Sequence, residues 1–546
     1  MRSVLITPLR AIGHIPVFLV MAFEIFTSPF TFGQAFPPDI RDDTATLWIN
    51  RIQLMLDGRG EMRLGQWGSG GRWMEHPGKS PTSIIFDQGL SVIGKIGGRL
   101  HGTFILWGTE YGPGPIRNGR PAMQESPQDS LRYHPYIVYR DDTTRGHYSQ
   151  WPRDLGAPID DRGSPAILGD AMVWSVANGL DTVNTRSGIR APHPRLPVEV
   201  RQAAFARAGT ACDSVAVLAN TVFFEWTIIA KGDSTIEDAS LAFWTDIDIG
   251  DAWWDAPAFD STGQFGYCLE MQPDAGAAVG YAILAGPVLR RNGDTALFLG
   301  KMRAGYGLLQ LRGFRGIGDD AMVASDVFGP PATIDEAWNL VHGLDNKGAV
   351  IVNPVTGGVT SFTCTGDPAS GRGWIMDRRF IGGGSGFLMH AGPFTLAPAD
   401  TQWVMIALVA ARGHSKTESV SILRDRFAEL RSMPYDSLLY APYPHIPCST
   451  SSAVETPVPA SAVLMPPSPN PMRNASTIRF MLPETGHVRM DLVDLLGRRI
   501  TALLDEDCSP GMHSVRLERN ALAPGLYLCR MQTSRAVRVT KVLVMK

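Results

Sequence analysis

Closely spaced carboxylates form the chain's strongest candidate for chemistry. They follow an apolar, strand-like stretch and are Asp246, Asp248, Asp251, Asp255 and Asp260. Oxygen ligands at the first, third and sixth positions, with Gly250 permitting a sharp turn, can wrap around a hard cation such as Ca²⁺. Like charges held this close repel one another unless something neutralises them. The pattern therefore suggests calcium, with Asp246, Asp248 and Asp251 as the central ligands.

Two alternatives remain open for this acidic run. It is not an EF-hand loop, because no glutamate closes it at the expected spacing and two tryptophans interrupt it. The plainer interpretation is an acidic loop whose aspartates accept hydrogen bonds from their own backbone turns. A pair of catalytic carboxylates, as in glycosidases, is the other alternative, and spacing along the chain does not measure the separation that such a pair needs.

Tryptophans beside glycines or in predicted loops are the second candidate group: Trp67, Trp73, Trp253, Trp254 and Trp374. Flat aromatic platforms with carboxylates nearby suit sugar rings. The alternative is that these indoles fill the core. Trp253 and Trp254 are the best candidates for ligand binding, because adjacent side chains of an extended segment face opposite ways and cannot both enter one core.

Sequence motifs for other chemistries are missing. We find no G-x-S-x-G, H-E-x-x-H, P-loop or C-x-x-C motif, and the histidines show no metal-ligand spacing. A net charge of −3 argues against a general nucleic-acid binder. These observations favour a structural, adhesive or ligand-binding protein without catalysis. The alternatives are an extracellular hydrolase acting on polysaccharide or peptide, and a calcium-dependent carbohydrate-binding module.

The sequence pattern predicts that the elements that position these residues are mainly strands. Hydrophobic residues make up 44 % of the chain, which also holds 57 glycines and 40 prolines. Strand-like runs at 222–230 and 241–245, and a further pair at 394–396 and 403–409, indicate β-structure. One helix begins at the capping box Ser415-x-x-Glu418. We predict a large, mainly β, sandwich-like body over 36–446 with at least one flanking helix, allowing two packed subdomains divided near residues 185–210.

The amino-terminal 35 residues resemble a secretory signal peptide. Arg2 and Arg10 precede an apolar stretch at 15–26, and Gly33-Gln34-Ala35 offers a cleavage site. A membrane anchor is the alternative, but the apolar stretch is short and contains Glu24. No other stretch is long enough to span a bilayer, so we expect no transmembrane span in the mature chain.

Composition changes sharply near the carboxyl end. Residues 447–468 are rich in serine, threonine and proline and predict an extended linker. Beyond it, short alternating runs such as Thr477 to Leu482 predict a small Ig-like β-sandwich over 469–546. Cys508 and Cys529 lie in this module and form either a disulfide or two isolated buried thiols.

The tail carries an ordered series of markers: Pro469-Asn470-Pro471, Thr477-Ile478-x-Phe480-x-Leu482-Pro483, Asp494-Leu495-Leu496-Gly497-Arg498-Arg499, Pro510-Gly511-x-His513, Gly525-x-Tyr527 and Lys546. This series resembles the type A C-terminal sorting domain of type IX secretion cargo. The resemblance implies recognition by the type IX machinery, passage through the outer membrane, and removal of the tail. The body is then released or attached to surface lipopolysaccharide. Met472 and Leu517-Glu518-Arg519 depart from the usual aromatic and Trp-Asp positions.

Motifs in the body carry a second resemblance: Trp151-x-x-Asp154-Leu155-Gly156-Ala157-Pro158, Trp244-x-Asp246-x-Asp248-Ile249-Gly250-Asp251, Gly366-Asp367-Pro368 and Gly392-Pro393-Phe394-x-Leu396. They are similar to uncharacterised exported proteins of bacteria that use this system. The resemblance brings no assigned reaction. It implies one long architecture for the body, with room for two packed β subdomains divided near residues 185–210.

Overall fold

The computed structural model describes the body over 44–59, 70–75, 81–125, 127–185, 188–189, 191–208, 216–273, 276–318 and 325–439. In the tail it describes 462–464, 467, 470, 472, 475–482, 485–494, 497–508, 511–519 and 522–545. The predicted signal peptide, nearly all of the predicted linker, Trp67, Pro469, Pro471 and Lys546 lie outside these residues. Body and tail are described separately below.

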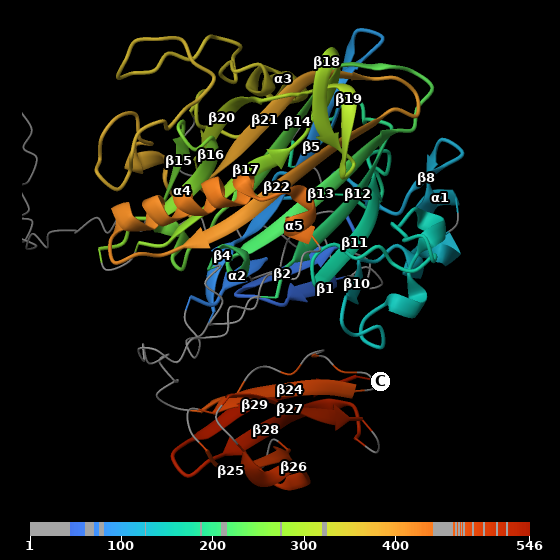
Figure 1. Cartoon of the computed structure of the whole chain (residues 1–546), viewed down its shortest axis with the longest axis vertical. Coiled ribbons are helices and arrows are strands. Elements are labelled where there is room, and N and C mark those ends of the chain that lie inside the picture. Colours follow the sequence, from blue (N-terminus) through green and yellow to red (C-terminus); the bar gives the residue numbers. More distant parts are fainter. Residues whose placement is uncertain are drawn as a thin grey trace, which may run out of the picture. The chain divides into compact units, whose positions relative to one another are not determined.

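The body is mainly β, as predicted (Figure 1). Its largest sheet has nine strands. Eight of them follow the order β10 (Tyr136–Tyr139), β11 (Ala171–Asn178), β12 (Val198–Ala206), β13 (Thr221–Ala230), β22 (Thr401–Ala411), β17 (Ala278–Ala285), β16 (Phe265–Glu270) and β15 (Asp255–Asp260), and β7 (Gly112–Pro113) pairs with β11. Because β11 and β12 are neighbours in this sheet, the suggested division near residues 185–210 does not separate two sheets.

A second sheet of five strands carries the acidic run. Its order is β20 (Leu311–Ile317), β21 (Gly386–Leu396), β14 (Ile236–Asp246), β5 (Asp87–Ile96) and β6 (Arg99–Thr103). The expected pairing of 394–396 with 403–409 is wrong, because β21 lies in this sheet whereas β22 lies in the larger one. A turn between two apolar runs fits a hairpin and a crossing between sheets equally well, and strands from distant parts of the chain decide which forms.

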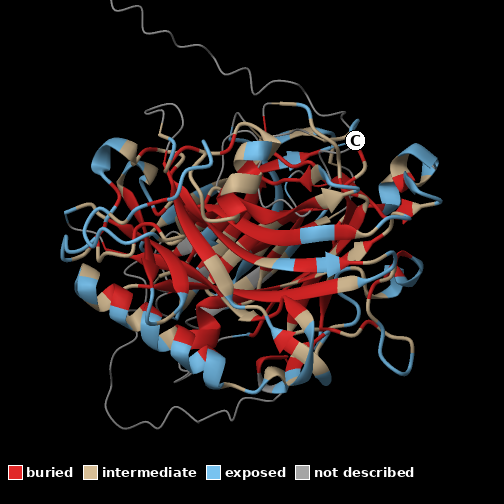
Figure 2. Cartoon of the chain, turned by 90° about the horizontal axis from the view of Figure 1, so that it is seen from above, coloured by how far each residue is buried: buried red, intermediate tan, exposed pale blue. Residues whose placement is uncertain are grey.

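Alternating side chains of β22 show why this strand is buried on both faces. Val404, Ile406 and Leu408 belong to the core that also includes Phe243 and Met389 of the five-stranded sheet. Trp403, Met405, Ala407 and Val409 point the other way and pack in a second core with helix residues. The large sheet is therefore a central layer, and Figure 2 shows burial concentrated on the strands.

Helix α4 (Lys416–Ser432) covers one face of the large sheet over β17 and β22 (Figure 1). The predicted capping box is formed: the Ser415 side chain accepts from the Glu418 backbone N–H, and Glu418 Oε2 accepts from the His414 backbone N–H at 2.6 Å. The predicted apolar stripe is buried and comprises Val420, Leu423, Phe427 and Leu430. An amphipathic stripe of this kind packs against the sheet and leaves the polar face to solvent.

The remaining strands of the body are short or stand apart. They are β1 (Thr44–Trp48), β2 (Ile52–Asp57), β3 (Gly71–Trp73) and β4 (Thr82–Ile85) in one sheet, and the pairs β8 (Ile116–Arg117) with β9 (Arg120–Pro121) and β18 (Val288–Phe298) with β19 (Lys301–Leu308). The other helices are α1 (Ala122–Glu125), α2 (Ala216–Ala219), α3 (Ile334–Val341), α5 (Tyr435–Leu439) and the 3₁₀ turns η3 (Pro127–Arg132), η4 (Tyr148–Gln150), η5 (Arg153–Leu155), η6 (Ala252–Trp254) and η7 (Arg378–Phe380). No helix in the described ranges combines the length and apolar character needed to cross a membrane.

The tail forms two small antiparallel sheets, in keeping with the Ig-like prediction. One is β23 (Val463–Leu464), β24 (Ala475–Leu482) and β27 (Gly511–Glu518); the other is β26 (Arg499–Cys508), β25 (Gly486–Val493), β28 (Gly525–Gln532) and β29 (Val537–Val544). The core between them holds the alternating residues expected from the sequence, including Ile478, Phe480, Val488 and Met490. Met472, which stands where the resembled family usually has an aromatic, is fully buried there.

Both cysteines of the tail are free, buried thiols. β25 lies between β26, which carries Cys508, and β28, which carries Cys529. Two strand spacings amount to roughly 9.5 Å, which exceeds the reach of a disulfide. The structure therefore has the isolated thiols and not the disulfide, the two possibilities that the sequence left open.

We expect Cys268, Cys364 and Cys529 to resist alkylation in the native protein and to react fully once it is unfolded. All three are fully buried, and burial raises the pKa of the Cys364 and Cys529 thiols to about 12. Peptide mass spectrometry after iodoacetamide treatment, with and without denaturant, measures this. A cysteine that stays unmodified in denaturant until a reductant is added would reveal a disulfide instead.

Candidate functional site

The acidic run lies where several strands of the five-stranded sheet end together. Asp246, the last residue of β14, is paired with Asp87 of β5 on one side and with Gly386 of β21 on the other. Gly386 in turn pairs with Ile317, the last residue of β20. The loops that leave these strands therefore meet at one edge of the sheet.

Four carboxyl groups gather at this edge, and we call Asp87, Asp246, Asp248 and Asp255 the carboxylate cluster. Asp87, Asp246 and Asp255 are at most 1 % exposed. Asp246 Oδ2 accepts from Trp107 Nε1 at 2.6 Å, and Asp255 Oδ2 accepts from the Ile249 backbone N–H at 2.7 Å. Asp248 Oδ1 and Asp255 Oδ1 are also buried, and neither accepts a hydrogen bond from the residues that the structure describes.

Burial changes the charge of this cluster. It raises the pKa of Asp248 to about 7, because a carboxylate removed from water is penalised. It raises the pKa of Asp255 well above its usual range, and the negative charges of Asp248, Glu270 and Asp246 raise it further. In the absence of a cation, the cluster therefore retains protons near neutral pH. Two chemical roles follow: holding a proton, or exchanging that proton for a bound cation.

Aromatic rings and glycines form the rim of the cluster. Trp107 has a backbone φ of 49°, which is uncommon for a bulky residue, and its ring lies edge-on to Trp244 at 5.1 Å. The backbone of the segment before β21 approaches the half-buried Trp107 and the exposed Trp253: a Cβ on Gly384 would lie 3.3 Å from the Trp107 ring, and one on Gly383 would lie 3.8 Å from Trp253. Only the approach at Gly384 is tighter than an ordinary contact, so a side chain there would press on the Trp107 ring.

Trp253 and Trp254 lie in η6 and not in an extended segment. Trp253 is 52 % exposed. Trp254 is half-buried, and the Arg378 guanidinium stacks on it at 3.7 Å from the ring centroid. Trp73 and Trp374 are buried in the core, which matches the alternative interpretation for those two residues.

The five predicted calcium ligands separate into three groups. Asp246, Asp248 and Asp255 belong to the carboxylate cluster. Asp251 is exposed beside this cluster, where its side chain accepts from the Trp253 backbone N–H and caps η6. Asp260 ends β15, roughly 17 Å along the strand from Asp255, and pairs with Arg424 of α4 at 2.6 Å. No three or more His, Cys, Asp or Glu side chains in the described ranges are arranged to hold a metal ion.

Sequence reasoning missed three residues of this site: Asp87, Trp107 and Arg378. Each comes from a segment more than 110 positions away from the acidic run. No local pattern marks them, since an isolated aspartate, tryptophan or arginine is common on loops. Asp87 becomes identifiable only once β5 is known to pair with β14.

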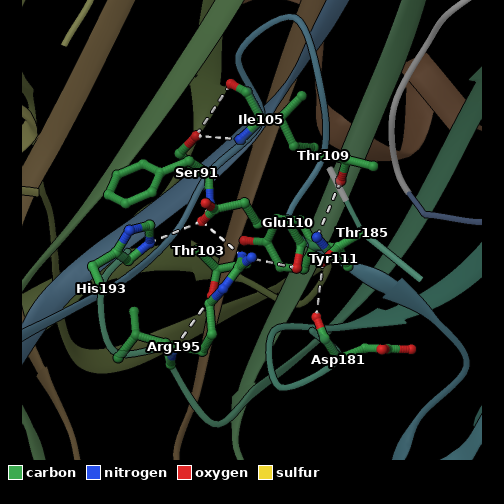
Figure 3. Close-up of polar contacts among 12 residues, drawn as sticks. Ser91, Thr103, Ile105, Thr109, Glu110, Tyr111, Asp181, Thr185, His193 and Arg195 are labelled. Atoms are coloured by element: carbon green, nitrogen blue, oxygen red, sulfur yellow. Dashed lines mark hydrogen bonds and ion pairs between the residues drawn. The ribbon is translucent and has the colours of Figure 1, made fainter. Parts of the chain in front are cut away.

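A second polar cluster, centred on Glu110, lies inside the body (Figure 3). Glu110 Oε2 accepts from the Phe104 backbone N–H at 3.0 Å, pairs with Arg195 at 2.8 Å, and lies 3.1 Å from His193 Nε2. The carboxylate has no exposed surface. Space for roughly one water, about 10 Å³, lies nearby between Tyr111 and other core side chains. This cluster links the loop that carries Glu110 to the loop that carries His193 and Arg195, and it is not open to a ligand from solvent.

The marker residues of the tail stabilise turns and bind the outer strand of one sheet. The Asn470 amide donates to the Lys541 carbonyl at 2.9 Å and accepts from the Leu543 backbone N–H at 2.7 Å, so it binds the outer strand β29. Gly497 has a φ of 79°, and Arg498 pairs with Asp494 at 2.7 Å across the same turn. Gly525 opens β28, and the Tyr527 hydroxyl donates to the Ala523 carbonyl at 2.9 Å.

Comparison with solved structures finds only distant similarity. A polysaccharide lyase shares 10 % identity with a TM-score of 0.19, over 76 % of this chain and 39 % of the lyase. Dimeric latent PorU from Porphyromonas gingivalis shares 10 % identity with a TM-score of 0.14, over 71 % of this chain and 31 % of PorU. This chain thus spans less than half the length of either protein, and the similarity assigns no function to the body.

Comparison at the sequence level is informative for the tail. A search of curated proteins returned no match. The family model for the secretion system C-terminal sorting domain matches residues 468–546. This region contains the ordered markers, the two small sheets and the core described above. Residues 468–546 are therefore a type IX secretion C-terminal sorting domain, and the chain is a cargo that this system exports to the cell surface or the extracellular space.

Proposed function

We propose that the exported body is a carbohydrate-binding module that acts without catalysis, as an adhesin or glycan receptor. The observation that carries this proposal is the half-exposed Trp253 beside the carboxylate cluster. A flat indole next to polar oxygens matches the apolar face and the hydroxyl edge of a sugar ring. The cluster lies at the meeting point of loops on a rigid sheet, where binding residues are commonly found.

Calcium is a second element of this proposal. The buried Oδ1 atoms of Asp248 and Asp255 lack hydrogen-bond partners within the described residues, and a buried carboxylate oxygen needs either a donor or a cation. Ca²⁺ prefers such oxygens and often keeps coordination positions for water or sugar hydroxyls. Asp248 and Asp255, which carry these oxygens, would supply the protein ligands, since no three carboxyl groups of the described residues are arranged around one ion. Asp260 is too far away to take part.

A hydrolase is the remaining candidate, and one observation favours it. A carboxyl group with a pKa near 7, as found for Asp248, is what a general acid needs in order to donate a proton at neutral pH. Incubating the protein with bound glycan and measuring new reducing ends distinguishes a hydrolase from a receptor. Release that disappears in Asp248→Asn would favour the enzyme.

We also propose that the mature protein lacks the signal peptide at 1–35 and much of the sorting domain. The family of the tail supports this, and so does the signal-like composition of the first 35 residues. Attachment of the processed body to surface lipopolysaccharide is the corresponding proposal for anchoring.

We expect Trp253→Ala to weaken glycan binding by about ten-fold or more while leaving thermal stability within about 0.5 kcal/mol of wild type. The indole is 52 % exposed, so the fold loses little when it is removed, whereas a stacked sugar loses its platform. Affinity gel electrophoresis with soluble polysaccharides measures the effect. Met302→Ala is the matched control, because Met302 is 66 % exposed on the separate strand β19. Equal losses in both variants would contradict the proposal.

A further inference from the structure

Two adjacent arginines near the rim have opposite surroundings. Arg379 pairs with Asp377, through Nε at 3.1 Å and Nη2 at 2.9 Å, so its charge is neutralised. Arg378 also is exposed, but we find no ion pair for it among the described residues. Its guanidinium lies over the Trp254 ring, with Cζ 3.7 Å from the ring centroid.

Stacking on an aromatic ring orients a guanidinium so that it can bind a carboxylate. The ring fixes the plane of the group, and the in-plane N–H donors stay free at its edge. Two parallel N–H groups match the two oxygens of a carboxylate, which is why arginine is favoured for bidentate binding of that group. Arginines of the fold find acceptors, either a carboxylate, as Arg379 does, or backbone carbonyls, as Arg315 does. Within the described residues we find neither kind of acceptor for Arg378.

The neighbouring carboxyl groups do not neutralise the positive charge of Arg378. Asp377 is engaged by Arg379, and Asp251 caps the backbone of η6. An anionic ligand that reaches Arg378 therefore meets a cation whose two neighbouring surface carboxyl groups are already engaged.

We infer that Arg378 and Trp254 form a subsite for an acidic sugar residue, a hexuronate whose carboxylate pairs with Arg378 while the glycan chain lies against Trp253. This inference rests on the proposed carbohydrate-binding function and names its ligand class. The contact between Arg378 and Trp254 joins two segments, 252–254 and 378–380, that meet only in the folded body.

The test compares polygalacturonate with its fully methyl-esterified form, which keeps the sugar backbone but masks the carboxylate. We expect the wild-type protein to bind the free acid about ten-fold to a hundred-fold more tightly than the ester. Arg378→Gln should abolish this preference and leave binding of the ester unchanged. Arg378→Lys should restore only part of it, because an ammonium lacks the planar pair of donors. Arg379→Gln, the matched control, should retain the full preference.

The outcomes distinguish failure of the subsite from failure of the proposed carbohydrate-binding function on which it rests. Equal binding of acid and ester by the wild type, or an undiminished preference in Arg378→Gln, overturns the subsite alone. Failure of the wild type to bind either form, or any neutral glycan in a parallel panel, overturns the proposed function together with the subsite. Thermal unfolding of each variant confirms that the exposed substitutions leave the body folded.

Discussion

In buffer without divalent cations, Asp248→Asn will stabilise the body at pH 8 and leave its stability nearly unchanged at pH 4. The pKa of Asp248 is raised to about 7 in the folded body, above the value of about 3.9 of an unfolded aspartate. The stability that this carboxyl contributes is thus fully present below pH 4 and is lost as the pH rises towards 7. The loss amounts to about 4 kcal/mol, and the asparagine removes it.

Thermal or urea unfolding at several pH values measures this effect. The wild-type free energy of unfolding should fall relative to that of Asp248→Asn between pH 4 and pH 7, and the gap should stay constant above that range. Asp251→Asn is the matched control: its carboxyl is exposed beside the cluster, and asparagine serves equally well as a cap. Parallel pH profiles for wild type and Asp248→Asn would show that the carboxyl has no special environment.

The same experiment tests calcium. A cation in the cluster favours the ionised carboxylates, so the wild type should gain stability in Ca²⁺, about 2.7 kcal/mol at a hundred-fold excess over Kd. Asp248→Asn should gain little. If the wild-type curves in millimolar Ca²⁺ and in EDTA coincide, the cluster holds protons and the calcium proposal fails, whereas the pH prediction stands on its own.

Glu110→Gln should destabilise the body by about 3–5 kcal/mol at pH 7. The carboxylate has no exposed surface and pairs with Arg195, which is itself largely buried. A neutral amide leaves the guanidinium of Arg195 buried without the carboxylate that it pairs with. A buried charge that has lost its paired partner is strongly destabilising. Urea unfolding monitored by tryptophan fluorescence gives the free energy.

The matched control is Asp326→Asn, which breaks an ion pair of similar length at the surface. Lys347 and Asp326 lie 2.7 Å apart, but their side chains are 75 % and 47 % exposed. Water already solvates both charges, so the expected cost is below about 1 kcal/mol. A similar cost for both variants would mean that the Glu110 cluster is wetter than the structure indicates.

Several features of this protein follow from the sequence alone, because short-range patterns determine them. The capping box at Ser415 and the stripe from Val420 to Leu430 are complete within one helix, since the contacts involved are three or four residues apart. The continuous apolar run of β22 predicts a strand buried on both faces, and the alternation in β24 predicts a strand with one buried face. The sorting domain was recognisable because its markers come in a fixed order over fewer than 80 residues.

Tertiary structure alone decided how these elements meet. The turn at 397–400 carries the chain from one sheet to the other, although its local sequence suits a hairpin equally well. Asp255 joins Asp246 and Asp248, whereas Asp260 is carried away by β15, because a strand separates its ends by about 3.3 Å per residue. Asp87, Trp107 and Arg378 reach the same edge only through pairing and packing of distant segments. Spacing along the chain carries no measure of such contacts, so the acidic run was visible in the sequence, but the site around it was not.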